Sequence, residues 1–387
     1  MWIFYIGAII PILIGAFFLW RDDEVTWQEW IGGAVAAFIL AAILHGIAIV
    51  GMTSDVETWS GQITKVSHMP RWVERWTDHH SETTYSGTGK NRTSHTRHWT
   101  TTEYDTHHEH WTATRNYGDY EDEVDIDESF FNEASHRFGG KIVEDGTQST
   151  HHFGGTRSSG DRNIYSAYNK TGYVYPVTTT KSFENRIKAA PTVFSFSKVP
   201  TNIVVFPWPD NPDWMRSDRL VGTASVLVNH YKWDCMNTSL GSRKFVNVIM
   251  VGFGDVSSDY GQYQQAKWIG GKKNDLVICY GGATRTSPPK WTYVFGWTES
   301  ELVKKNLQTL VLEHPINDDL IPLIAQEVAQ NYVIKDWSKF DYISIDPPSW
   351  SYWVYFILLA ATQIGLYVFF HKNDFGKTSG TYYRRRY

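Results

Sequence analysis

Three long apolar segments interrupt an otherwise polar chain. Residues 1–20 and 31–52 carry no charged side chain, and the third apolar segment covers residues 347–370. A helix that crosses roughly 30 Å of hydrocarbon needs about 20 apolar residues, and all three segments reach that length. Because lipid offers the backbone no hydrogen-bond partner, each segment must bond internally as a helix. We therefore predict three transmembrane helices, which form a helical hairpin within residues 1–52 and a return helix over residues 347–371.

Charge beside these segments predicts how the chain crosses the bilayer. The C-terminal tail, residues 372–387, holds five basic residues against a single acid, Asp374. Short basic flanks stay in the cytoplasm, whereas large domains cross regardless of charge. We therefore expect a basic cytoplasmic tail, a main body over residues 53–346 outside the cytoplasm, and a location in a bacterial inner membrane or an equivalent bilayer. The first segment could instead be a cleaved signal peptide, but it has no basic N-terminal region and no small-residue cleavage site.

The first half of the body, residues 53–190, has a composition typical of strands. It is rich in Thr, Ser, His, Tyr and Trp and poor in Leu, which favours a β-rich extracytoplasmic region. Two Thr-rich runs at 81–85 and 94–104 flank the sequence Gly-Thr-Gly-Lys-Asn at 87–91, where Gly and Asn tolerate a positive φ. We therefore predict a hairpin. Few of its side chains are apolar, so it would project into solvent or lie against a partner; partial disorder is the alternative.

The second half of the body, residues 191–346, has the pattern of a packed α/β layer. Short apolar runs at 246–251 and 276–280 predict buried strands, and residues 257–268 between them have a helical composition. A further strand is predicted at 291–297.

Two helices are predicted to follow this strand. Thr298 and Glu301 match a capping box, in which each side chain satisfies a free backbone N–H, so a helix should run from there to about Glu313. The second helix has one apolar face at helical spacing, made by Ile321, Ile324, Ala325, Val328 and Tyr332. The predicted fold class is therefore a membrane-anchored α+β protein with three transmembrane helices, a β-rich polar half and an α/β half.

Residues 245–336 resemble the TPM domain, an α/β fold that is usually held outside the membrane with an anchor beside it. The likeness rests on the first apolar strand, on Gln-Ala-Lys-Trp-Ile-Gly-Gly at 265–271, on Asn-Asp-Leu-Val-Ile at 274–278 and on the terminal helix pair. Residues 182–187 and 193–196 extend the likeness to membrane proteins of bacteria and tailed phages that have no assigned activity. The resemblance implies a TPM-like α/β domain, and some TPM proteins are described as phosphatases or calcium binders.

Histidine is the most prominent candidate chemistry. Eleven of the fifteen histidines lie within residues 68–152. Neutral imidazole is a good ligand for zinc, copper or nickel. Alternate residues of a strand share a face, so His108 and His110 should point the same way, and closure of the hairpin would bring His80 roughly opposite His98. We therefore predict a transition-metal site, with zinc as the candidate ion, whose ligands are His80, His98, His108 and His110.

Several of these features have a second interpretation. No zinc spacing such as His-Glu-x-x-His is present, and the histidines could instead hydrogen-bond to carboxylates or stack on Trp99 and Trp111. The acidic run at 119–128 fits either calcium ligands or an edge strand protected by charge. Cys235 and Cys279 could form one disulfide outside the cytoplasm or remain thiols.

Composition narrows the function. The net charge of −5 gives no case for a nucleic-acid partner, and no nucleophile elbow or phosphate loop is present. Aromatic residues make up 16 % of the chain, and such residues are favoured at protein interfaces. We predict a membrane-anchored extracytoplasmic structural, assembly or interaction protein without enzymatic activity, bound to a lipid bilayer and homo-oligomeric. The alternative is a metal-dependent or TPM-like hydrolase, such as a phosphatase, at the membrane surface.

Overall fold

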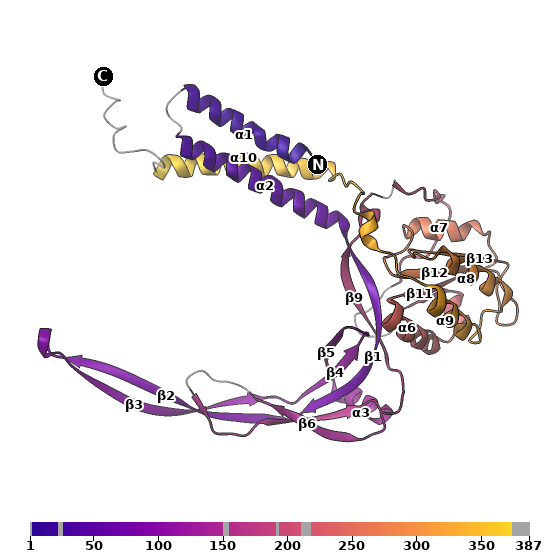
Figure 1. The fold of residues 1–387 in the computed structure, drawn as a ribbon, viewed down its shortest axis with the longest axis horizontal. Coiled ribbons are helices and arrows are strands. Elements are labelled where there is room, and N and C mark those ends of the chain that lie inside the picture. Colours follow the sequence, from indigo (N-terminus) through magenta and orange to yellow (C-terminus); the bar gives the residue numbers. More distant parts are fainter. Residues whose placement is uncertain (1, 22–25, 150–154, 191–192, 210–217, 374–387) are drawn as a thin grey trace.

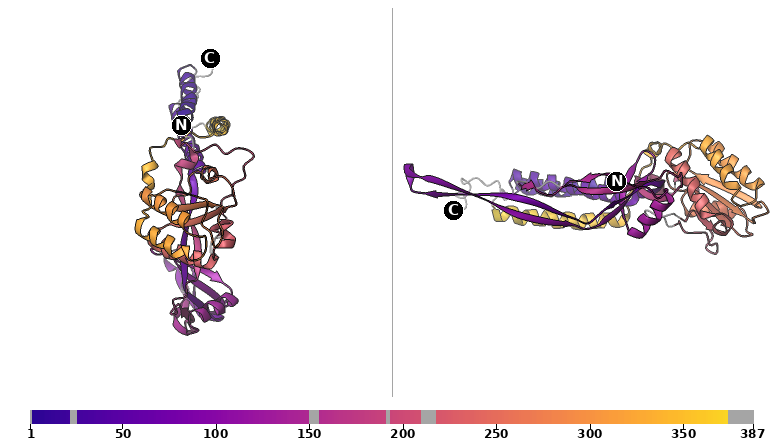
Figure 2. Two further views of the ribbon diagram at one scale, coloured as in Figure 1. Left: turned by 90° about the vertical axis from the view of Figure 1, so that its right-hand side faces the viewer. Right: turned by 90° about the horizontal axis from the view of Figure 1, so that it is seen from below.

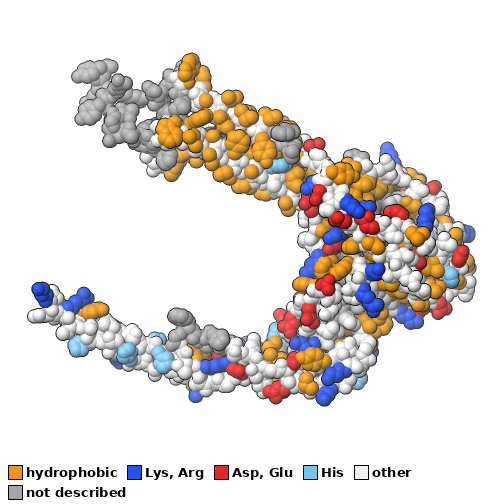
Figure 3. All heavy atoms as spheres, in the orientation of Figure 1, with side chains coloured by type: hydrophobic (Ala, Val, Ile, Leu, Met, Phe, Trp, Pro, Cys, Tyr) orange, Lys and Arg blue, Asp and Glu red, His pale blue; other side chains and the backbone are white. Residues whose placement is uncertain are grey.

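The protein has three parts: a bundle of long helices, a globular α/β head and a long two-stranded ribbon. The computed structural model describes residues 2–21, 26–149, 155–190, 193–209 and 218–373, which form a mixed α/β structure with sheets of six, four and three strands. Figure 1 shows the bundle and the ribbon as two arms joined by the sheet beside the head, and in Figure 2 both arms extend toward the same side. Apolar side chains cover the bundle in Figure 3, whereas few lie on the ribbon.

Three long helices form the bundle: α1 (Trp2–Arg21), α2 (Trp27–Thr53) and α10 (Ser349–Asn373). Helix α2 and the stretch Ser349–Phe370 of α10 are long and apolar enough to cross a membrane, by length and composition. The apolar stretch of α1 that the structure describes, Ile3–Phe17, is shorter. The described residues therefore give two candidate membrane spans, where the sequence predicted three.

Polar contacts fix the helices of the bundle against one another. Trp30 Nε1 donates to the carbonyl oxygen of Ile12 at 2.9 Å, which ties α2 to α1. Gln363 Nε2 donates to the carbonyl oxygen of Gly33 at 3.1 Å, which ties α10 to α2. An unsatisfied polar group is costly in apolar surroundings, so these bonds favour one register of the three helices over others.

A six-stranded antiparallel sheet connects the bundle to the ribbon. Its central strand, β1 (Ser54–Met69), begins directly after α2 without a loop. Ile63 and Val66 of β1 are fully buried, and Phe131 of the covering helix and Phe138 directly after that helix pack onto the same core. Strand β1 is bonded on both edges, to β4 on one and to β8 and β9 on the other. The strands that pair with β1 are β4 (His110–Asn116), β8 (Arg162–Tyr168) and β9 (Pro176–Glu184). Strands β5 (Glu121–Ile126) and β6 (Ile142–Gln148) lie outside β4 and β8, and the covering helix is α3 (Glu128–Arg137).

The ribbon belongs to a second, three-stranded sheet. Strands β2 (Trp72–Ser86) and β3 (Thr93–His107) form a hairpin around the short turn Gly89–Asn91. Strand β7 (Gly155–Arg157) pairs with three residues of β2 near the base of the ribbon. The hairpin predicted from the Thr-rich runs is confirmed, and Gly87 adopts the positive φ, +92°, that its turn requires.

The head is built on a four-stranded sheet. Strands β10 (Leu220–Gly222), β11 (Asn247–Phe253) and β12 (Asp275–Gly281) run parallel, and β13 (Trp291–Gly296) is antiparallel to β12. Every residue of β11 and β12 is buried, because helices cover both faces of the sheet. Helices α6 (His230–Lys244), α8 (Glu301–Glu313) and α9 (Leu320–Asn331) cover the first face, and α7 (Asp259–Lys267) covers the second. Three short helices complete the described helices: α4 (Arg186–Ala189), α5 (Ala224–Leu227) and η3 (Trp337–Phe340).

Most elements of the head agree with the sequence pattern. The strands predicted at 246–251, 276–280 and 291–297 are confirmed as β11, β12 and β13, and the three predicted helices are confirmed as α7, α8 and α9. Helix α6 was missed because its sequence is polar. Its buried Trp233, Met236 and Leu240 follow the i, i+3, i+7 spacing of a helix face, which was the available signal.

The capping box predicted at Thr298 and Glu301 is wrong. Helix α8 begins at Glu301 after Ser300, with no side-chain cap. Thr298 Oγ1 instead donates to the carbonyl oxygen of Val333 at 2.8 Å, which ties the end of β13 to the segment after α9. A capping box does start α2, where Thr26 N donates to a Glu29 carboxylate oxygen at 2.7 Å and Glu29 N donates to Thr26 Oγ1 at 3.3 Å.

Candidate interaction site: the ribbon and its anchorage

The ribbon is long, regular and exposed. Strands β2 and β3 pair over fifteen consecutive residues, from Trp72 opposite His107 to Ser86 opposite Thr93, without a register shift. Thirteen of the fifteen residues of β3 are exposed. Within the described part of the chain, β3 pairs with β2 alone, so its outer edge is open along its whole length. A strand edge of this kind presents unpaired N–H and C=O groups to any further strand.

The two faces of the ribbon differ in chemistry, because successive side chains of a strand point to opposite faces and directly opposed residues share one. We call one the tryptophan face and the other the threonine face. The tryptophan face carries Trp72, Trp76, Trp99, Glu74, Asp78, His80, Glu82, His95, Arg97, Glu103 and Asp105. The threonine face carries Thr77, Thr83, Thr96, Thr100, Thr102 and Thr106 together with His79 and His98.

The structure does not bring the four predicted metal ligands together. His80 lies opposite Trp99, and His98 lies opposite Ser81, so the two histidines are on opposite faces of the ribbon. The sequence prediction was wrong by one residue in register, and one residue is enough to reverse a face. The ring of His80 instead stacks on Trp99 with 5.2 Å between ring centroids, and its Nε2 lies 2.8 Å from Thr101 Oγ1.

The other two predicted ligands lie at the far end of β3. His108 is in the connection to β4, where its carbonyl oxygen accepts a bond from Arg162, and His110 Nε2 lies 3.3 Å from Asp125 Oδ1. His68 stacks on Trp111 with 5.4 Å between ring centroids, so both predicted Trp stacks are present. Among the described residues, no group of three or more His, Cys, Asp or Glu side chains could hold a metal ion.

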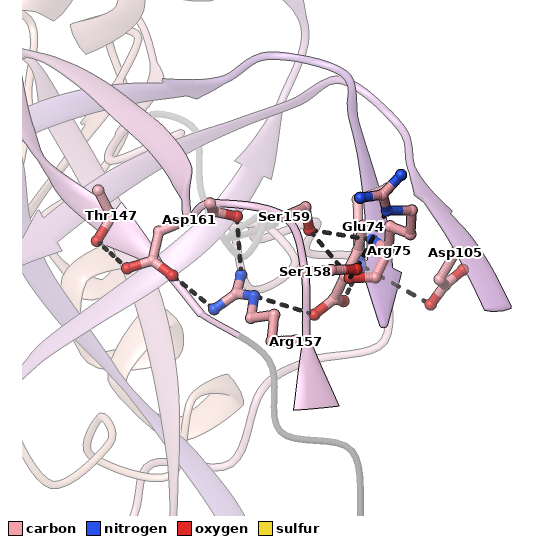
Figure 4. A network of polar contacts seen from close by, with 10 residues as sticks. Glu74, Arg75, Asp105, Thr147, Arg157, Ser158, Ser159 and Asp161 are labelled. Carbon is pink, nitrogen blue, oxygen red and sulfur yellow. Dashed lines mark hydrogen bonds and ion pairs between the residues drawn. The ribbon is translucent and has the colours of Figure 1, made fainter. Parts of the chain in front are cut away.

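A buried carboxylate anchors the base of the ribbon (Figure 4). Glu74 on β2 has no exposed surface, although the strand that carries it is mostly in solvent. One carboxylate oxygen lies 3.1 Å from His107 Nε2 on β3 and the other lies 3.5 Å from Arg157 Nε on β7. Arg157 continues to Asp161 at 2.5 Å, and its guanidinium lies over the ring of Trp72 at 5.0 Å. Glu74 therefore connects all three strands of the ribbon sheet.

Two further contacts join the ribbon to the rest of the molecule. Ser158 and Ser159, which follow β7, bond to the backbone and side chain of Arg75 on β2, as Figure 4 shows. Arg162, at the start of β8, donates to the carbonyl oxygens of Met69, Pro70 and His108, which lie at the points where the chain enters and leaves the ribbon. The base of the ribbon is thus fixed by charge-assisted bonds, and no ion pair between described residues lies farther along the ribbon.

A second polar cluster ties β1 to the head. Arg219, fully buried, donates to Ser60 Oγ on β1 at 2.7 Å and to Asn247 Oδ1 at 2.6 Å, and it lies 3.4 Å from the buried Asp234 carboxylate. Asn247 Nδ2 in turn donates to Asp275 at 2.7 Å. Burial raises the pKa of Asp275 to about 6 even though Asn247 and the Lys272 N–H hydrogen-bond to its charged form.

The head also has a cavity of about 680 Å³ beside the loops that follow β10 and β12. Its polar side chains already bond to the surrounding loops. Asp318 accepts from the Asn229 N–H at 2.8 Å and from Lys232 Nζ at 2.9 Å, and Arg285 donates to the carbonyl oxygen of Val226 at 2.7 Å. Burial alone would raise the pKa of Asp318, but the bonds from Lys232 and Asn229 outweigh it and lower that pKa.

The acidic run at 119–128 and the two cysteines can also be compared with their predictions. The acidic run contains β5, which is an edge strand of the six-stranded sheet, and its Val124 and Ile126 pack against the core. Cys235 and Cys279 are both free thiols, and Cys279 is buried in β12. Of the histidines, His151 and His152 lie outside the described residues.

Comparison with known proteins gives no match. No family model, no curated protein and no solved structure is similar to this chain. The likeness to the TPM domain therefore stays a prediction from the sequence.

Proposed function

We propose that this protein is a membrane-anchored assembly or interaction protein whose working element is the β2–β3 ribbon. The observation that carries the proposal is the fifteen-residue ribbon itself, which is exposed on both faces and open along the edge of β3. A two-stranded hairpin without a packed face is marginal in water, and burial against another chain would stabilise it. The anchored base gives such an element a defined direction from the head.

The membrane part of the proposal rests on the bundle. Helices α2 and α10 have the length and composition of spanning helices, and α1 packs against both of them as a third. The proposed topology places the head and ribbon outside the cytoplasm of a bacterial inner membrane or an equivalent bilayer. The basic tail that would lie in the cytoplasm falls, from residue 374 on, outside the described residues.

The direction of the two arms adds a constraint. The ribbon and the bundle extend toward the same side (Figure 2), so an upright bundle would bring the ribbon to the depth of the lipid. Polar side chains and an open strand edge are not accommodated in hydrocarbon. The proposal therefore requires the two arms to be farther apart in the membrane than in the structure, so that the ribbon lies in water along the membrane surface.

A shortened ribbon tests the proposal. Asp78 and Thr101 are directly opposed, so replacing residues 79–100 by Asn-Gly leaves a two-residue hairpin and keeps the anchored base. In mild detergent we expect the wild-type chain to have a mass that is a multiple of 44.5 kDa and the shortened chain to be a monomer. Both should stay in the membrane pellet after an alkaline wash. A monomeric wild-type chain, or a wild-type chain released by the wash, would overturn the proposal.

The cavity in the head favours a second candidate, a TPM-like or metal-dependent hydrolase. It lies beside the loops after two parallel strands, which is where α/β sheets commonly bind ligands. The test is phosphatase activity of the purified chain on a generic phosphomonoester, with and without added zinc or calcium. Activity that Asp318→Asn abolishes would support this candidate, and an inactive chain under all these conditions would remove it.

A further inference from the structure

The outer edge of β3 is complementary to itself. We propose that it binds the same edge of a second copy of this chain, antiparallel, about a two-fold axis that passes midway between the two Thr100 residues and stands perpendicular to the plane of the ribbon. The two ribbons would then form one four-stranded sheet with the order β2, β3, β3 of the partner and β2 of the partner. This inference rests on the proposed function and specifies the oligomer that the ribbon forms.

Charge along β3 is the first support for this pairing. In the proposed register the residue numbers of two opposed residues, one from each copy, add up to 200. Arg97 therefore faces Glu103 and His95 faces Asp105, and the symmetry makes each pair twice. All four side chains lie on the tryptophan face, so each pair meets on one side of the combined sheet. Directly opposed residues of antiparallel strands have Cβ atoms about 5 Å apart, which is within reach of these side chains.

Neighbouring registers satisfy fewer charges. A shift to a sum of 198 places His95 opposite Glu103 but leaves Arg97 opposite Thr101. A shift to 202 places Arg97 opposite Asp105 but sets His95 opposite His107. A parallel pair of β3 strands would set Arg97 beside Arg97 and Glu103 beside Glu103, and like charges in opposed positions are destabilising.

The edge of β3 also lacks the usual protection against pairing. Native edges are commonly blocked by proline, by lysine, by a bulge or by a covering segment. Strand β3 contains no Pro or Lys, its register with β2 is unbroken, and no described segment covers its outer edge. The charges that it does carry, Arg97, Glu103 and Asp105, would protect a lone edge but are paired in the proposed register. The outer half of β2, by contrast, has a single charge, Glu82, so pairing that strand with itself would place two acids close together without a base.

The symmetry is compatible with membrane anchoring. Two copies anchored in one bilayer must be related by an axis along the membrane normal. An axis perpendicular to the ribbon then sets both ribbons flat over the membrane surface, in water, with the two heads at opposite ends of the shared sheet. This is the placement of the ribbon that the proposed function requires.

Cysteine cross-linking of the full-length chain in mild detergent tests the register. Thr100 meets its symmetry mate on the axis, so Thr100→Cys should give a covalent dimer with copper phenanthroline or a short bis-maleimide. Thr96 lies on the same face and is equally exposed, but it would be eight residues from its mate, about 26 Å along the strand. Thr96→Cys and the wild-type chain should therefore give no dimer above background. A cross-link that peaks at Trp99→Cys or Thr101→Cys instead would overturn the proposed register.

Charge reversal tests the pairing itself. Arg97→Glu should raise the dimer dissociation constant at least about tenfold, because it sets an acidic side chain opposite Glu103 of the other copy at both symmetry-related positions. Arg97→Glu combined with Glu103→Arg should restore it, whereas Lys141→Glu, at an exposed lysine outside the ribbon, should change it little. A multimeric wild-type chain that is indifferent to Arg97→Glu and to Thr100→Cys would overturn this inference and leave the proposed function standing. A monomeric wild-type chain would overturn both.

Discussion

Strands β1 and β3 are almost equal in length, at sixteen and fifteen residues, yet their surroundings are opposite. Strand β1 is bonded on both edges and presents Ile63 and Val66 to a core. Strand β3 is bonded on one edge and has no buried residue. Strand β1 is therefore specified by its own chain, whereas β3 has half of its backbone groups available to another.

The difference lies in what each strand can bury. Ile63 and Val66 are three residues apart, and the register shift between Ile63 and Lys65 lets both reach the same core. The register of β1 is fixed because a slip would expose that core. Strand β3 is polar on both faces, with its charged residues on the tryptophan face, so only hydrogen bonds and charge pairs can select its partner. Four predictions test or sharpen this contrast, beginning with the largest effect.

Arg219→Ala should destabilise the fold by about 3–5 kcal/mol, because it leaves the buried Asp234 carboxylate without its closest cation and removes the bond to Ser60 on β1. The free energy of unfolding in detergent, measured by denaturant titration, checks this. Arg285→Ala, at an exposed arginine of the head, is the control and should cost under about 1 kcal/mol. Equal losses in the two variants would mean that the junction does not stabilise β1.

The stability should depend on pH through Asp275. Its pKa in the folded chain, about 6, is higher than the ordinary value of 3.8, so the folded state binds the extra proton between these values. Stability from this group is present at pH 4 and is lost as the pH rises through 6, a change of about 3 kcal/mol. Asp275→Asn should remove that change. An unchanged pH profile in the variant would assign the titration to other groups.

Matched truncations compare the two strands directly. Val66→Ala on β1 should cost about 2 kcal/mol, because it removes two buried methyl groups from a packed core. Thr96→Ala on β3 should cost under about 0.5 kcal/mol, because its side chain is exposed. Thermal unfolding of both variants measures the difference. Similar losses would contradict the claim that the ribbon lies outside the cooperative core.

The smallest effect is expected at the base of the ribbon. Glu74→Gln should loosen β2 and β7 locally by about 1 kcal/mol, because a neutral amide removes the charge that pairs with Arg157 and weakens the bond to His107. Hydrogen exchange of the Trp76–Asp78 amides reports the opening. Glu82→Gln, at an exposed carboxylate farther along the same face, should leave that exchange unchanged.

Local pattern predicted most of the elements of the head but missed the polar helix α6, and it was insufficient for the contacts between elements. The buried strands of the head and the hairpin follow from runs of apolar residues and from Gly and Asn at a turn. The register of the ribbon could not be predicted in this way. The numbers of opposed residues in β2 and β3 add up to 179, whereas the sequence prediction set His80 opposite His98, which add up to 178. Arg157 and Arg219 could not be assigned at all, since each acts on a strand far away in sequence.

Backbone hydrogen exchange of the full-length chain at several concentrations in mild detergent tests the central claim most directly. The amides of β1 should be protected at every concentration, because both edges of that strand are bonded within the chain. In β3, the amides that face β2 should be protected throughout, and the outward-facing amides should gain protection as the concentration rises. Outward-facing amides of β3 that exchange quickly at every concentration would contradict the account.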